Sequence, residues 1–470
     1  MADICVIGAG PAGSTYAARM AQLGHDVCLI ERARFPRRHL GESLSPGVLP
    51  LLATTGARDA VEAAGFRRVR NVHVKWDGEL KVREDAREEG LLVDRGDFDR
   101  LLLERARTLG VRVLQPANVR ERKGGDGGWR INVETAGGAA RIHADFVADA
   151  GGRSAGYAAQ RQRTGCRTLA LYAYWRGSDL PAEPRIEAGA DAWYWGVPLP
   201  DGTYNTLVFV DVKQFRAASA GSLQGRFLAL LARSGLMTGC RDAHLTGTVL
   251  AADATPYLDA GSVTPSSIKV GEAALAIDPL SSSGVQKAMQ SALAAAIVTN
   301  TLLRMPASGG AALSFYRANL ADASARHCRW TAGHYGTVAA RSGGRFWEDR
   351  AAGAAPEPPV LARTPLDAHA LSATRVALSR QLEFVEVPCI DDEFVTLRQA
   401  LRHPGLEGPV AYVGGWELAP LLRRLPAAST PLQIAQSWSD RMPLQSGVAL
   451  AGWLYNNGIL VAQTPVACVS

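Results

Sequence analysis

Residues 1–31 constrain the fold more than any other stretch of this chain. Ile4-Cys5-Val6-Ile7 is a short apolar run with β-branched residues, typical of a buried strand. The glycine-rich turn Gly8-Ala9-Gly10-Pro11-Ala12-Gly13 follows directly, and residues 14–23 are mostly helix-forming. A second apolar run, Val27-Cys28-Leu29-Ile30, ends at Glu31. The order strand, G-x-G-x-x-G, helix, strand and acidic residue predicts a unit that binds a dinucleotide.

Each part of this unit has a physical role in holding a dinucleotide. Gly8 allows the tight turn, Gly10 lets a pyrophosphate approach the backbone, and Gly13 lets the helix pack closely on the strand. The free N–H groups at the helix N-terminus add a partial positive charge. The carboxylate of Glu31 stands where it can bind the hydroxyls of a ribose. An ordinary tight turn is the alternative, but the complete context favours the dinucleotide site.

The composition describes an ordinary globular protein without a face for nucleic acid. At 470 residues the chain exceeds a single core, so we expect two or three domains. The net charge of +6 arises from 51 basic and 45 acidic residues, with no long Lys/Arg run. We therefore expect a mixed, solvated surface and no nucleic-acid partner. A preference for an acidic partner or substrate stays open.

The cysteines and the apolar segments bear on metal binding and on the compartment. The seven cysteines are scattered without C-x-x-C spacing, which argues against a zinc site or a disulfide framework. Cys5 and Cys28 fall inside predicted strands, where we expect small buried side chains. The N-terminus shows no signal-peptide pattern, and no apolar stretch is long enough to span a bilayer. We expect a cytoplasmic protein that binds no metal.

The rest of the chain alternates between strand-rich and helical stretches. Residues 169–263 are rich in strands and aromatic residues, which suits a sheet with one face over a pocket. The glycine-rich stretch 124–128 predicts a hairpin turn rather than a second phosphate site. Further elements are expected along the chain: strands at 71–76, 142–150 and 268–270, helices at 49–64, 284–303 and 315–338, and a Pro/Ala/Gly-rich linker at 351–365.

Later stretches distinguish FAD from NAD as the dinucleotide. A predicted strand ends in Asp149-Ala150-Gly151-Gly152-Arg153-Ser154, and Gly271-Glu272-Ala273 lies much later in the chain. Together with Arg95, they resemble motifs of FAD-dependent oxidoreductases with the p-hydroxybenzoate-hydroxylase-like fold. In that fold the acid of the G-D turn binds the ribityl chain, and the arginine lies along the cofactor. Glu272 replaces the usual aspartate. The resemblance implies an α/β fold with a Rossmann-like FAD-binding domain, and NAD alone is the less favoured alternative.

The residues expected to contact FAD come from these motifs and from the polar turn after the second strand. They are Gly8, Gly10, Ala12, Gly13, Glu31, Arg32, Arg38, Gly41, Glu42, Ser43, Arg95, Val119, Asp149, Ala150, Gly151, Gly271, Glu272, Pro279, Ser283, Gly284 and Val285. The sequence contains no second nucleotide cradle. The reductant is therefore either NAD(P)H, bound transiently near the flavin, or a separate flavin reductase.

A narrower resemblance depends on three further stretches. They are Gly41-Glu42-Ser43-Leu44-Ser45-Pro46, Trp193-Tyr194-Trp195-Gly196-Val197-Pro198 and Asp278-Pro279-Leu280-Ser281-Ser282-Ser283-Gly284. They resemble the G-E-S, W-x-W-x-I-P and D-P-L-x-S-S-G stretches of the flavin-dependent halogenase branch. That branch also contains geranylgeranyl-reductase-like proteins and the flavoprotein monooxygenases that hydroxylate a protein-bound tryptophan in tryptophylquinone biogenesis. The resemblance implies a flavoprotein oxidoreductase with an aromatic substrate.

The third of these stretches has an electrostatic role. Ser282 to Gly284 begin the apolar helix that we predict as far as Leu303. The free N–H groups and the positive end of the helix dipole would face the flavin pyrimidine, where they stabilise the negative charge of reduced flavin. A plain helix cap is the alternative.

Halogenation requires a residue that this chain lacks. Halogenases of this branch carry a lysine eight residues before the tryptophan that ends a strand on the substrate side. Here that tryptophan is Trp76, the lysine position holds Arg68, and Lys75 is expected to point elsewhere. Arginine is not deprotonated at ordinary pH and replaces a lysine amine poorly. Ser281 also stands where tryptophan halogenases place a glutamate, although phenol and pyrrole halogenases lack that residue too.

Monooxygenation requires less from the protein. Reduced flavin and O2 transfer a hydroxyl group to an electron-rich ring when water is excluded. Trp193 and Trp195 project to one face of a strand and could wall such a pocket, with core packing as the alternative. The residues expected at the catalytic site are Trp193, Trp195, Ser282 and Arg68.

Two C-terminal stretches extend the resemblance. Residues 315–347 and 412–417 resemble the same regions of the tryptophylquinone-maturation flavoproteins. The resemblance implies that a peptide or protein could carry the aromatic group. His327, Trp330 and His334 share one face of the predicted helix, where packing or surface roles are favoured over proton transfer.

These observations combine into one prediction of domains and function. Three regions are expected: a discontinuous FAD-binding domain (1–70, 91–165 and 260–305), a β-sheet substrate domain (71–90 and 166–259), and a mostly helical, winged-helix-like extension (306–470). The expected function is FAD-dependent monooxygenation of an electron-rich aromatic, a tryptophan or other indole, either free or on a peptide or protein. Halogenation, a reduction of the geranylgeranyl-reductase type and a non-catalytic flavin-binding assembly role are the alternatives.

Overall fold

The computed structural model describes residues 2–84, 89–154, 160–217, 221–352, 372–423, 425 and 429–463. Two compact units are present, Met1–Gly309 with Tyr316–Ala355, and Gly310–Phe315 with Pro356–Ser470. The predicted extension at 306–470 differs from this division, because most of the long helix α8 (Gly309–Ser342) groups with the first unit. The predicted linker at 351–365 lies almost entirely outside the described residues.

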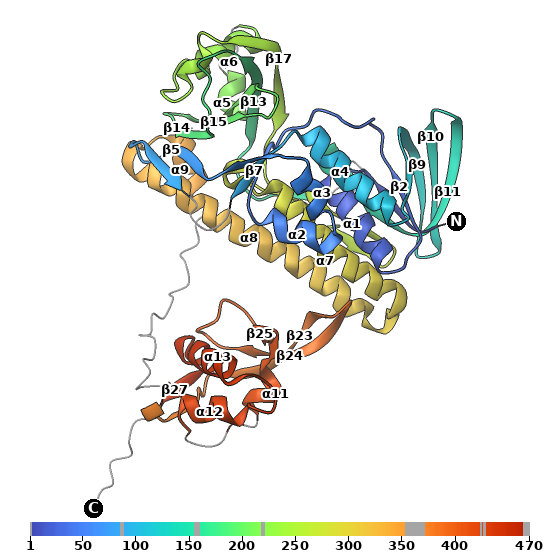
Figure 1. The fold of residues 1–470 in the computed structure, drawn as a ribbon, viewed down its shortest axis with the longest axis vertical. Helices are drawn as coiled ribbons and strands as arrows, with labels where there is room; N and C mark the ends of the chain where they lie inside the picture. Colours follow the sequence, from blue (N-terminus) through green and yellow to red (C-terminus); the bar gives the residue numbers. More distant parts are fainter. Residues whose placement is uncertain are drawn as a thin grey trace, which may run out of the picture. The chain divides into compact units, whose positions relative to one another are not determined.

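A mostly parallel sheet forms the centre of the first unit (Figure 1). Its strand β1 (Ala2–Ile7) pairs in parallel with β2 (Val27–Ile30) and with β11 (Gly138–Asp149). Every residue of β2 is buried, as expected for a parallel strand that is covered on both faces. The other strands of the sheet are β8 (Arg112–Leu114), β9 (Ala117–Gly125), β10 (Gly128–Thr135), β19 (Val263–Thr264) and β20 (Ser267–Lys269).

An antiparallel ribbon of β9, β10 and β11 covers one face of the parallel strands. Cys5 and Cys28 pack there against Ile131 and Val133 of β10 in one apolar cluster. Both thiols are fully buried, and burial raises the pKa of each, so the prediction of small core cysteines is confirmed. The predicted glycine-rich turn joins β9 to β10.

Helices cover the parallel strands on the other side (Figure 1). Helix α1 (Pro11–Gln22) starts with proline and packs against α4 (Arg95–Thr108) and α7 (Gly284–Arg304). The Tyr16 hydroxyl of α1 donates a hydrogen bond to Thr299 Oγ1 of α7 at 2.9 Å. Helix α7 begins at Gly284, as predicted.

The single helix predicted for 49–64 is two helices. Helix α2 (Val48–Thr55) ends because Gly56 adopts a left-handed conformation with φ of 70°, and α3 (Arg58–Ala63) follows. One small sheet lies near these helices and contains β3 (Ser43–Leu44), β7 (Gly90–Leu92) and β4 (Arg67–Val69). A second small sheet lies beside the flavin motifs and contains β12 (Arg161–Arg163), β18 (Tyr257–Asp259) and β21 (Leu275–Ala276).

A seven-stranded sheet forms the rest of the first unit. It joins two stretches that are far apart in sequence, because β5 pairs in parallel with β14. In spatial order its strands are β17 (His244–Asp253), β13 (Thr168–Arg176), β16 (Tyr204–Asp211), β15 (Ala192–Pro198), β14 (Arg185–Ala188), β5 (Asn71–Lys75) and β6 (Lys81–Glu84).

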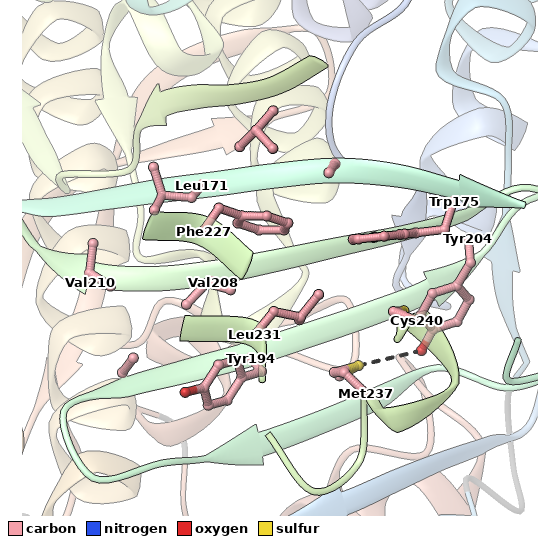
Figure 2. Packing of buried hydrophobic residues seen from close by; sticks show 13 residues of the cluster. Leu171, Trp175, Tyr194, Tyr204, Val208, Val210, Phe227, Leu231, Met237 and Cys240 are labelled. Carbon is pink, nitrogen blue, oxygen red and sulfur yellow. Dashed lines mark hydrogen bonds between the residues drawn. The ribbon is translucent and has the colours of Figure 1, made fainter. Parts of the chain in front are cut away.

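The two faces of this sheet are packed by different helices. Figure 2 shows one face, where Phe227 and Leu231 of α6 (Leu223–Leu231) pack on apolar residues of β13 and β16. The short α5 (Val212–Ala217) directly follows β16. Tyr194 belongs to this face, whereas Trp193 and Trp195 point to the other, as the period of a strand requires. There they meet α8 and α9 (Arg345–Ala351).

The second unit contains short helices and a hairpin, as predicted. Its apolar core includes Leu401, Trp438 and Leu454. Thr430 caps the second helix through a capping box, because its hydroxyl accepts from Gln433 N at 3.3 Å and its N–H donates to Gln433 Oε1 at 3.0 Å. The elements are β22 (Val376–Leu378), β23 (Glu383–Asp391), β24 (Phe394–Arg402), β25 (Tyr412–Val413), β26 (Trp416–Glu417), α11 (Leu418–Leu422), α12 (Pro431–Ser437), α13 (Leu444–Asn456) and β27 (Leu460–Ala462).

Within the described residues, no helix is long and apolar enough to cross a membrane. The same residues contain no group of three or more His, Cys, Asp or Glu side chains that could hold a metal ion.

Candidate active site

The turn between β1 and α1 forms an open cradle. A Cβ at Gly8, where φ is 101°, would lie 2.5 Å from the carbonyl oxygen of Ala150. A Cβ at Gly13 would lie 1.8 Å from the Gly8 oxygen, so neither glycine can carry a side chain here. At Gly10 the nearest described atom would be Arg37 Nη2, at 3.7 Å. The space above Gly10, at the N-terminus of α1, therefore fits the pyrophosphate of a dinucleotide.

Glu31 lies beside this cradle at the end of β2. Its carboxylate accepts hydrogen bonds from Ala9 N at 2.7 Å and from Ala33 N at 2.8 Å. A carboxylate has about four lone-pair sites, so both oxygens keep the capacity to accept ribose hydroxyls. The neighbouring Arg32 is exposed, and its Nη2 lies 3.5 Å from Ser154 Oγ.

The three glycine-containing motifs converge around α1. Val270 N donates to Asp149 O at 2.9 Å, which places the stretch after β20 beside the stretch after β11. Gly271 has φ of 59°, and a Cβ there would lie 2.7 Å from the Cβ of Ala12. Ala150 N donates to Ile7 O at 2.8 Å. The structure thus brings together residues that lie more than a hundred positions apart in the sequence.

The acids of the two later motifs are paired within the protein. The Asp149 carboxylate accepts from Arg122 Nη2 at 2.9 Å and from Gly151 N at 3.0 Å. Arg153 Nε donates to Glu272 Oε1 at 3.2 Å. Val119 lies in β9, partly buried against the apolar cluster below the sheet. Cofactor contacts for these residues stay predictions.

Arg95 organises the polar turn after β2. Its Nε and Nη2 donate to the two carboxylate oxygens of Asp99 at 3.1 and 3.2 Å, and its Nη1 donates to Leu40 O at 2.6 Å. Arg37 Nη2 lies 3.2 Å from the same Asp99 carboxylate. Because a bidentate arginine pair is rigid, these contacts hold the stretch that leads into Gly41. The sequence identified Arg95 but not this use of its guanidinium.

Glu42 connects that turn to the seven-stranded sheet. The residue is only 5% exposed, and its carboxylate accepts from Tyr174 Oη at 3.0 Å, Asn205 Nδ2 at 3.1 Å and Gly41 N at 3.0 Å. Burial raises the pKa of Glu42 above its usual value, although these hydrogen bonds oppose the shift. The guanidinium of Arg38, an exposed residue, lies 5.8 Å from the ring centre of Tyr174.

The start of α7 is open and uncapped. Ser282 adopts a left-handed conformation with φ of 50°, and Ser283 precedes the helix without a side-chain cap. A Cβ at Gly284 would have no described atom within 4 Å. The free N–H groups of this turn therefore suit the electron-rich edge of a flavin. Ser45 Oγ donates to Gln286 Oε1 at 2.7 Å, so the G-E-S stretch reaches the same turn.

Two more predicted cofactor contacts, Pro279 and Val285, flank this turn. Pro279 begins the short 3-10 turn Pro279–Ser281 just before α7. Val285 packs, partly buried, on the core formed by α2 and α4. Ser43 lies in β3 and pairs with Leu92.

The loop before α7 is held by α8. Asp278 is 8% exposed, and the Tyr335 hydroxyl lies 2.9 and 3.0 Å from its two carboxylate oxygens. Leu280 N donates to Asp278 Oδ1 at 3.0 Å, and His327 Nε2 lies 3.0 Å from Asp278 O. Burial raises the pKa of Asp278 and Tyr335 and lowers that of His327.

Aromatic side chains cover the face of the sheet that carries Trp193 and Trp195. Trp193 is 2% exposed and stacks on Phe209 with ring centres 3.7 Å apart. Trp76 lies 6.3 Å from Trp193 and 5.6 Å from Trp347, both edge-on. Trp195 belongs to the same cluster and is partly buried. The prediction that Trp193 and Trp195 share one face of the strand is confirmed. Side chains of α8 and α9 pack against this face.

Comparison with known proteins identifies the cofactor domain and gives several relatives. The model of the FAD-binding domain family matches residues 1–169. A tryptophan 2-halogenase from Chondromyces crocatus is 33% identical over 340 residues, which make up 67% of this chain and 64% of that protein. The flavin-dependent halogenase armH2 from Armillaria mellea is 28% identical over 371 residues, 69% of this chain and 70% of that protein. The chain thus spans just under two thirds of the first of these relatives.

Solved structures match along almost the whole chain. The peptidyl tryptophan dihydroxylase QhpG, essential for tryptophylquinone cofactor biogenesis, superposes with a TM-score of 0.74 at 28% identity, over 97% of this chain and 99% of that one. The chain is similar to members of the FAD-dependent halogenase-like branch of flavoproteins. The flavin-dependent halogenase CmlS, with a TM-score of 0.78 at 21% identity over 99% of this chain and 96% of that one, shares the fold. The predicted Rossmann-like FAD fold of the hydroxylase and halogenase type is confirmed, with a helical C-terminal part, and residues 1–169 form an FAD-binding domain.

The position of Arg68 is informative for the comparison with halogenases. Arg68 lies on β4, in a different sheet from β5, which leads to Trp76. Its side chain is 44% exposed and lies 3.6 Å from Glu62 and 3.7 Å from Glu89. A catalytic role for Arg68, Trp193, Trp195 and Ser282 stays a prediction. Lys75 points elsewhere, as predicted, because its Nζ donates to Glu187 Oε1 at 3.1 Å.

Sequence reasoning missed the contact between Asp278 and Tyr335. Tyr335 lies within the stretch 315–347 that carries the resemblance, but no local pattern pairs two residues 57 positions apart. His327, Trp330 and His334 do share one face of α8, with ring centres 6.0 and 4.3 Å apart along the row. A cavity of about 320 Å³ lies beside Asp278, and Tyr335 and His327 line it.

Proposed function

We propose that this protein is an FAD-dependent monooxygenase that hydroxylates an electron-rich aromatic group. A tryptophan or other indole, free or carried on a peptide or protein, is the proposed substrate. Bound FAD, when reduced, supplies with O2 the electrophilic oxygen for the ring. The observation that carries the proposal is the state of two basic side chains, at the lysine position of halogenases and beside Trp76: Arg68 is an exposed guanidinium beside Glu62 and Glu89, and Lys75 is paired with Glu187.

The chain's own residues would bind the cofactor, stabilise its negative charge and exclude water from the reaction. The cradle at Gly10 would hold the pyrophosphate, and the uncapped start of α7 would favour the negative charge of reduced flavin. The aromatic cluster around Trp193 would exclude water from the reacting ring. The similarity to a tryptophan 2-halogenase and to a peptidyl tryptophan dihydroxylase supports an indole as the ring.

The reducing equivalents come from outside the chain. We propose NAD(P)H bound transiently near the flavin, or a separate flavin reductase, because the glycine-rich turn at 124–128 joins two strands and offers no helix N-terminus for a second nucleotide. Either donor leaves the proposed hydroxylation unchanged.

Oxygen labelling tests the proposal. FAD-loaded protein is supplied with chemically reduced flavin, ¹⁸O2 and either free tryptophan or a tryptophan-containing peptide, and the product is analysed by intact mass. We expect incorporation of one or two labelled oxygen atoms into the indole ring. Retention of the substrate mass with both substrates, while the flavin is reoxidised, would contradict the proposal.

Halogenation is the second candidate, favoured by the 33% identity to a tryptophan 2-halogenase. We predict that Arg68→Lys confers no robust halogenation, because the new amine would still lie on β4 between Glu62 and Glu89. The assay is product mass with bromide present, and Lys75→Arg is the matched control. A bromine isotope pair from the Arg68→Lys variant alone would show that position 68 reaches the substrate.

A further inference from the structure

The cavity beside Asp278 adjoins the stretch that leads into α7. Residues of the loops next to β12 and β18, the stretch 276–278, α8 and α9 line it, all within the first compact unit. Its volume of about 320 Å³ lies at the lower end of small-molecule pockets, which suits one ring system with a short substituent. Tyr335 lines the cavity and also lies 6.0 Å from Trp347 and 6.2 Å from Trp76, so the cavity adjoins the aromatic cluster.

Arg350 places a permanent positive charge in the wall of this cavity. The residue is 7% exposed, and among the described residues no carboxylate lies within ion-pair distance of it. Its Nη1 donates to Phe346 O at 3.1 Å and its Nη2 to Thr168 Oγ1 at 3.0 Å, both neutral acceptors. Its Nε has no hydrogen-bond partner in the described part of the chain. A guanidinium has five N–H donors and cannot lose its charge. The guanidinium carbon of Arg350 lies 3.7 Å from the centre of the Phe346 ring, and its Nε donor stays unused.

In the described part of the chain, the other ionisable side chains of the wall form no ion pair with Arg350. The Asp278 carboxylate accepts a hydrogen bond from Tyr335. Burial raises the pKa of its carboxyl group, and the charge of Arg350 opposes that shift. Burial lowers the pKa of His327, so its imidazole adds no fixed charge. Asp349 is mostly exposed and lies 3.5 Å from Arg345. Burying an unpaired charge is costly, which makes an anionic ligand the natural partner of Arg350.

We propose that this cavity binds a small aromatic carboxylic acid, with Arg350 as the partner of the carboxylate. The ring would occupy the side of the cavity that Tyr335 and the aromatic cluster form. This inference rests on the proposed function and narrows its substrate class to indole acids with a free carboxylate, including the free amino acid. An indole within a chain, flanked by amide bonds, would lack the group that Arg350 recognises.

A pair of matched ligands tests the inference on the unmodified protein. The affinities of the FAD-loaded enzyme for indole-3-propionate and for indole-3-propionamide are measured by calorimetry. A charged hydrogen-bonded pair predicts about 10- to 100-fold tighter binding of the acid. Equal affinities, or no binding of either ligand by protein that retains FAD, would overturn the inference.

Three variants assign the preference to Arg350. Arg350→Gln should remove the preference for the acid, whereas Arg350→Lys, which keeps the charge but not the planar fork, should retain part of it. Arg345→Gln on the same helix is the control and should leave the preference unchanged, because Arg345 is exposed. Retained FAD absorbance shows that each variant is folded. A full preference for the acid in folded Arg350→Gln would contradict the assignment.

Two outcomes of these binding and oxygenation assays distinguish this inference from the proposed function. If the acid binds through Arg350 but no substrate gains oxygen, the cavity is correct and the monooxygenase proposal fails. If a peptide with an amidated C-terminus gains oxygen at the same rate in wild type and Arg350→Gln, the monooxygenase proposal stands and the carboxylate site is overturned.

Discussion

The residues of the glycine-rich turn differ in what a side chain would do there. Gly8 and Gly13 are required by the fold itself, because a Cβ at either position would collide with backbone atoms. Gly10 is different, since a Cβ would meet no described atom closer than 3.7 Å. The fold alone does not require glycine at position 10. Pyrophosphate binding does, which is what the G-x-G-x-x-G spacing predicted.

Gly10→Val should therefore separate folding from FAD binding. We expect a folded protein whose FAD affinity falls at least about tenfold, since a branched side chain fills the space of the phosphates. Bound flavin is measured by visible absorbance after gel filtration, and folding by thermal unfolding. Gly127→Val, in open space at the β9–β10 turn, is the control. A Gly10→Val protein that retains the full absorbance of bound FAD would contradict the assignment of this turn as the pyrophosphate site.

Glu42 shows what a motif can and cannot predict about a residue. The G-E-S resemblance marked it as a cofactor contact, yet its carboxylate accepts hydrogen bonds from Tyr174 of β13 and Asn205 of β16. Those donors lie more than a hundred residues away and have no local signature. Its burial could not be predicted, because it depends on how the seven-stranded sheet meets the turn after β2.

The raised pKa of Glu42 predicts a pH dependence of stability. A carboxyl group with a raised pKa binds its proton more tightly in the folded state. Stability is therefore lost as pH rises from the ordinary value of 4.5 through the raised one. Glu42→Gln cannot lose a proton, so its melting temperature should improve relative to wild type over that range. Melting curves from pH 4 to 8 measure this, and a difference independent of pH would contradict the assigned burial effect.

Helices and strands were predicted better than the contacts between them. β1, α1, β2 and α7 follow from apolar runs, glycine spacing and an open helix start. The region 49–64 was predicted as one helix because Gly56 stands within an otherwise helical pattern, and only its left-handed backbone ends α2. The packing of α8 against the loop before α7 had no sequence signal, because it joins Tyr335 to Asp278 through tertiary structure alone.

Removal of a single oxygen atom should weaken the contact between α8 and the loop before α7. Tyr335→Phe removes the hydroxyl that bonds both carboxylate oxygens of Asp278. Leaving a buried carboxyl group without this donor should cost about 1–3 kcal/mol of stability. Chemical unfolding of the FAD-loaded protein measures the loss. Thr337→Val, an exposed position of the same helix, is the control and should change stability little. Equal stabilities of Tyr335→Phe and wild type would show that α8 does not hold the loop through this bond.

At the scale of the molecule, the sequence predicted the cofactor domain more fully than the substrate side. The FAD motifs follow one another in a fixed order, and each has a physical reason for its residues. The substrate side depends on topology: β5 joins β14, which lies more than a hundred residues later, and so brings Trp76 to Trp193. The boundary of the C-terminal part also differed, since α8 was expected to belong to it and most of its residues group with the first unit. Apolar periodicity identifies a helix but not the unit on which it packs.

One competition reaction tests the central claim that this halogenase-like flavoprotein transfers oxygen. Wild-type protein receives free tryptophan, reduced flavin, ¹⁸O2 and excess bromide in the same vessel, and the product is analysed by mass spectrometry. We predict a labelled oxygen on the indole ring and no bromine isotope pair, because the described substrate side presents an exposed arginine and a paired lysine. Brominated tryptophan as the main product would contradict this account and establish a halogenase.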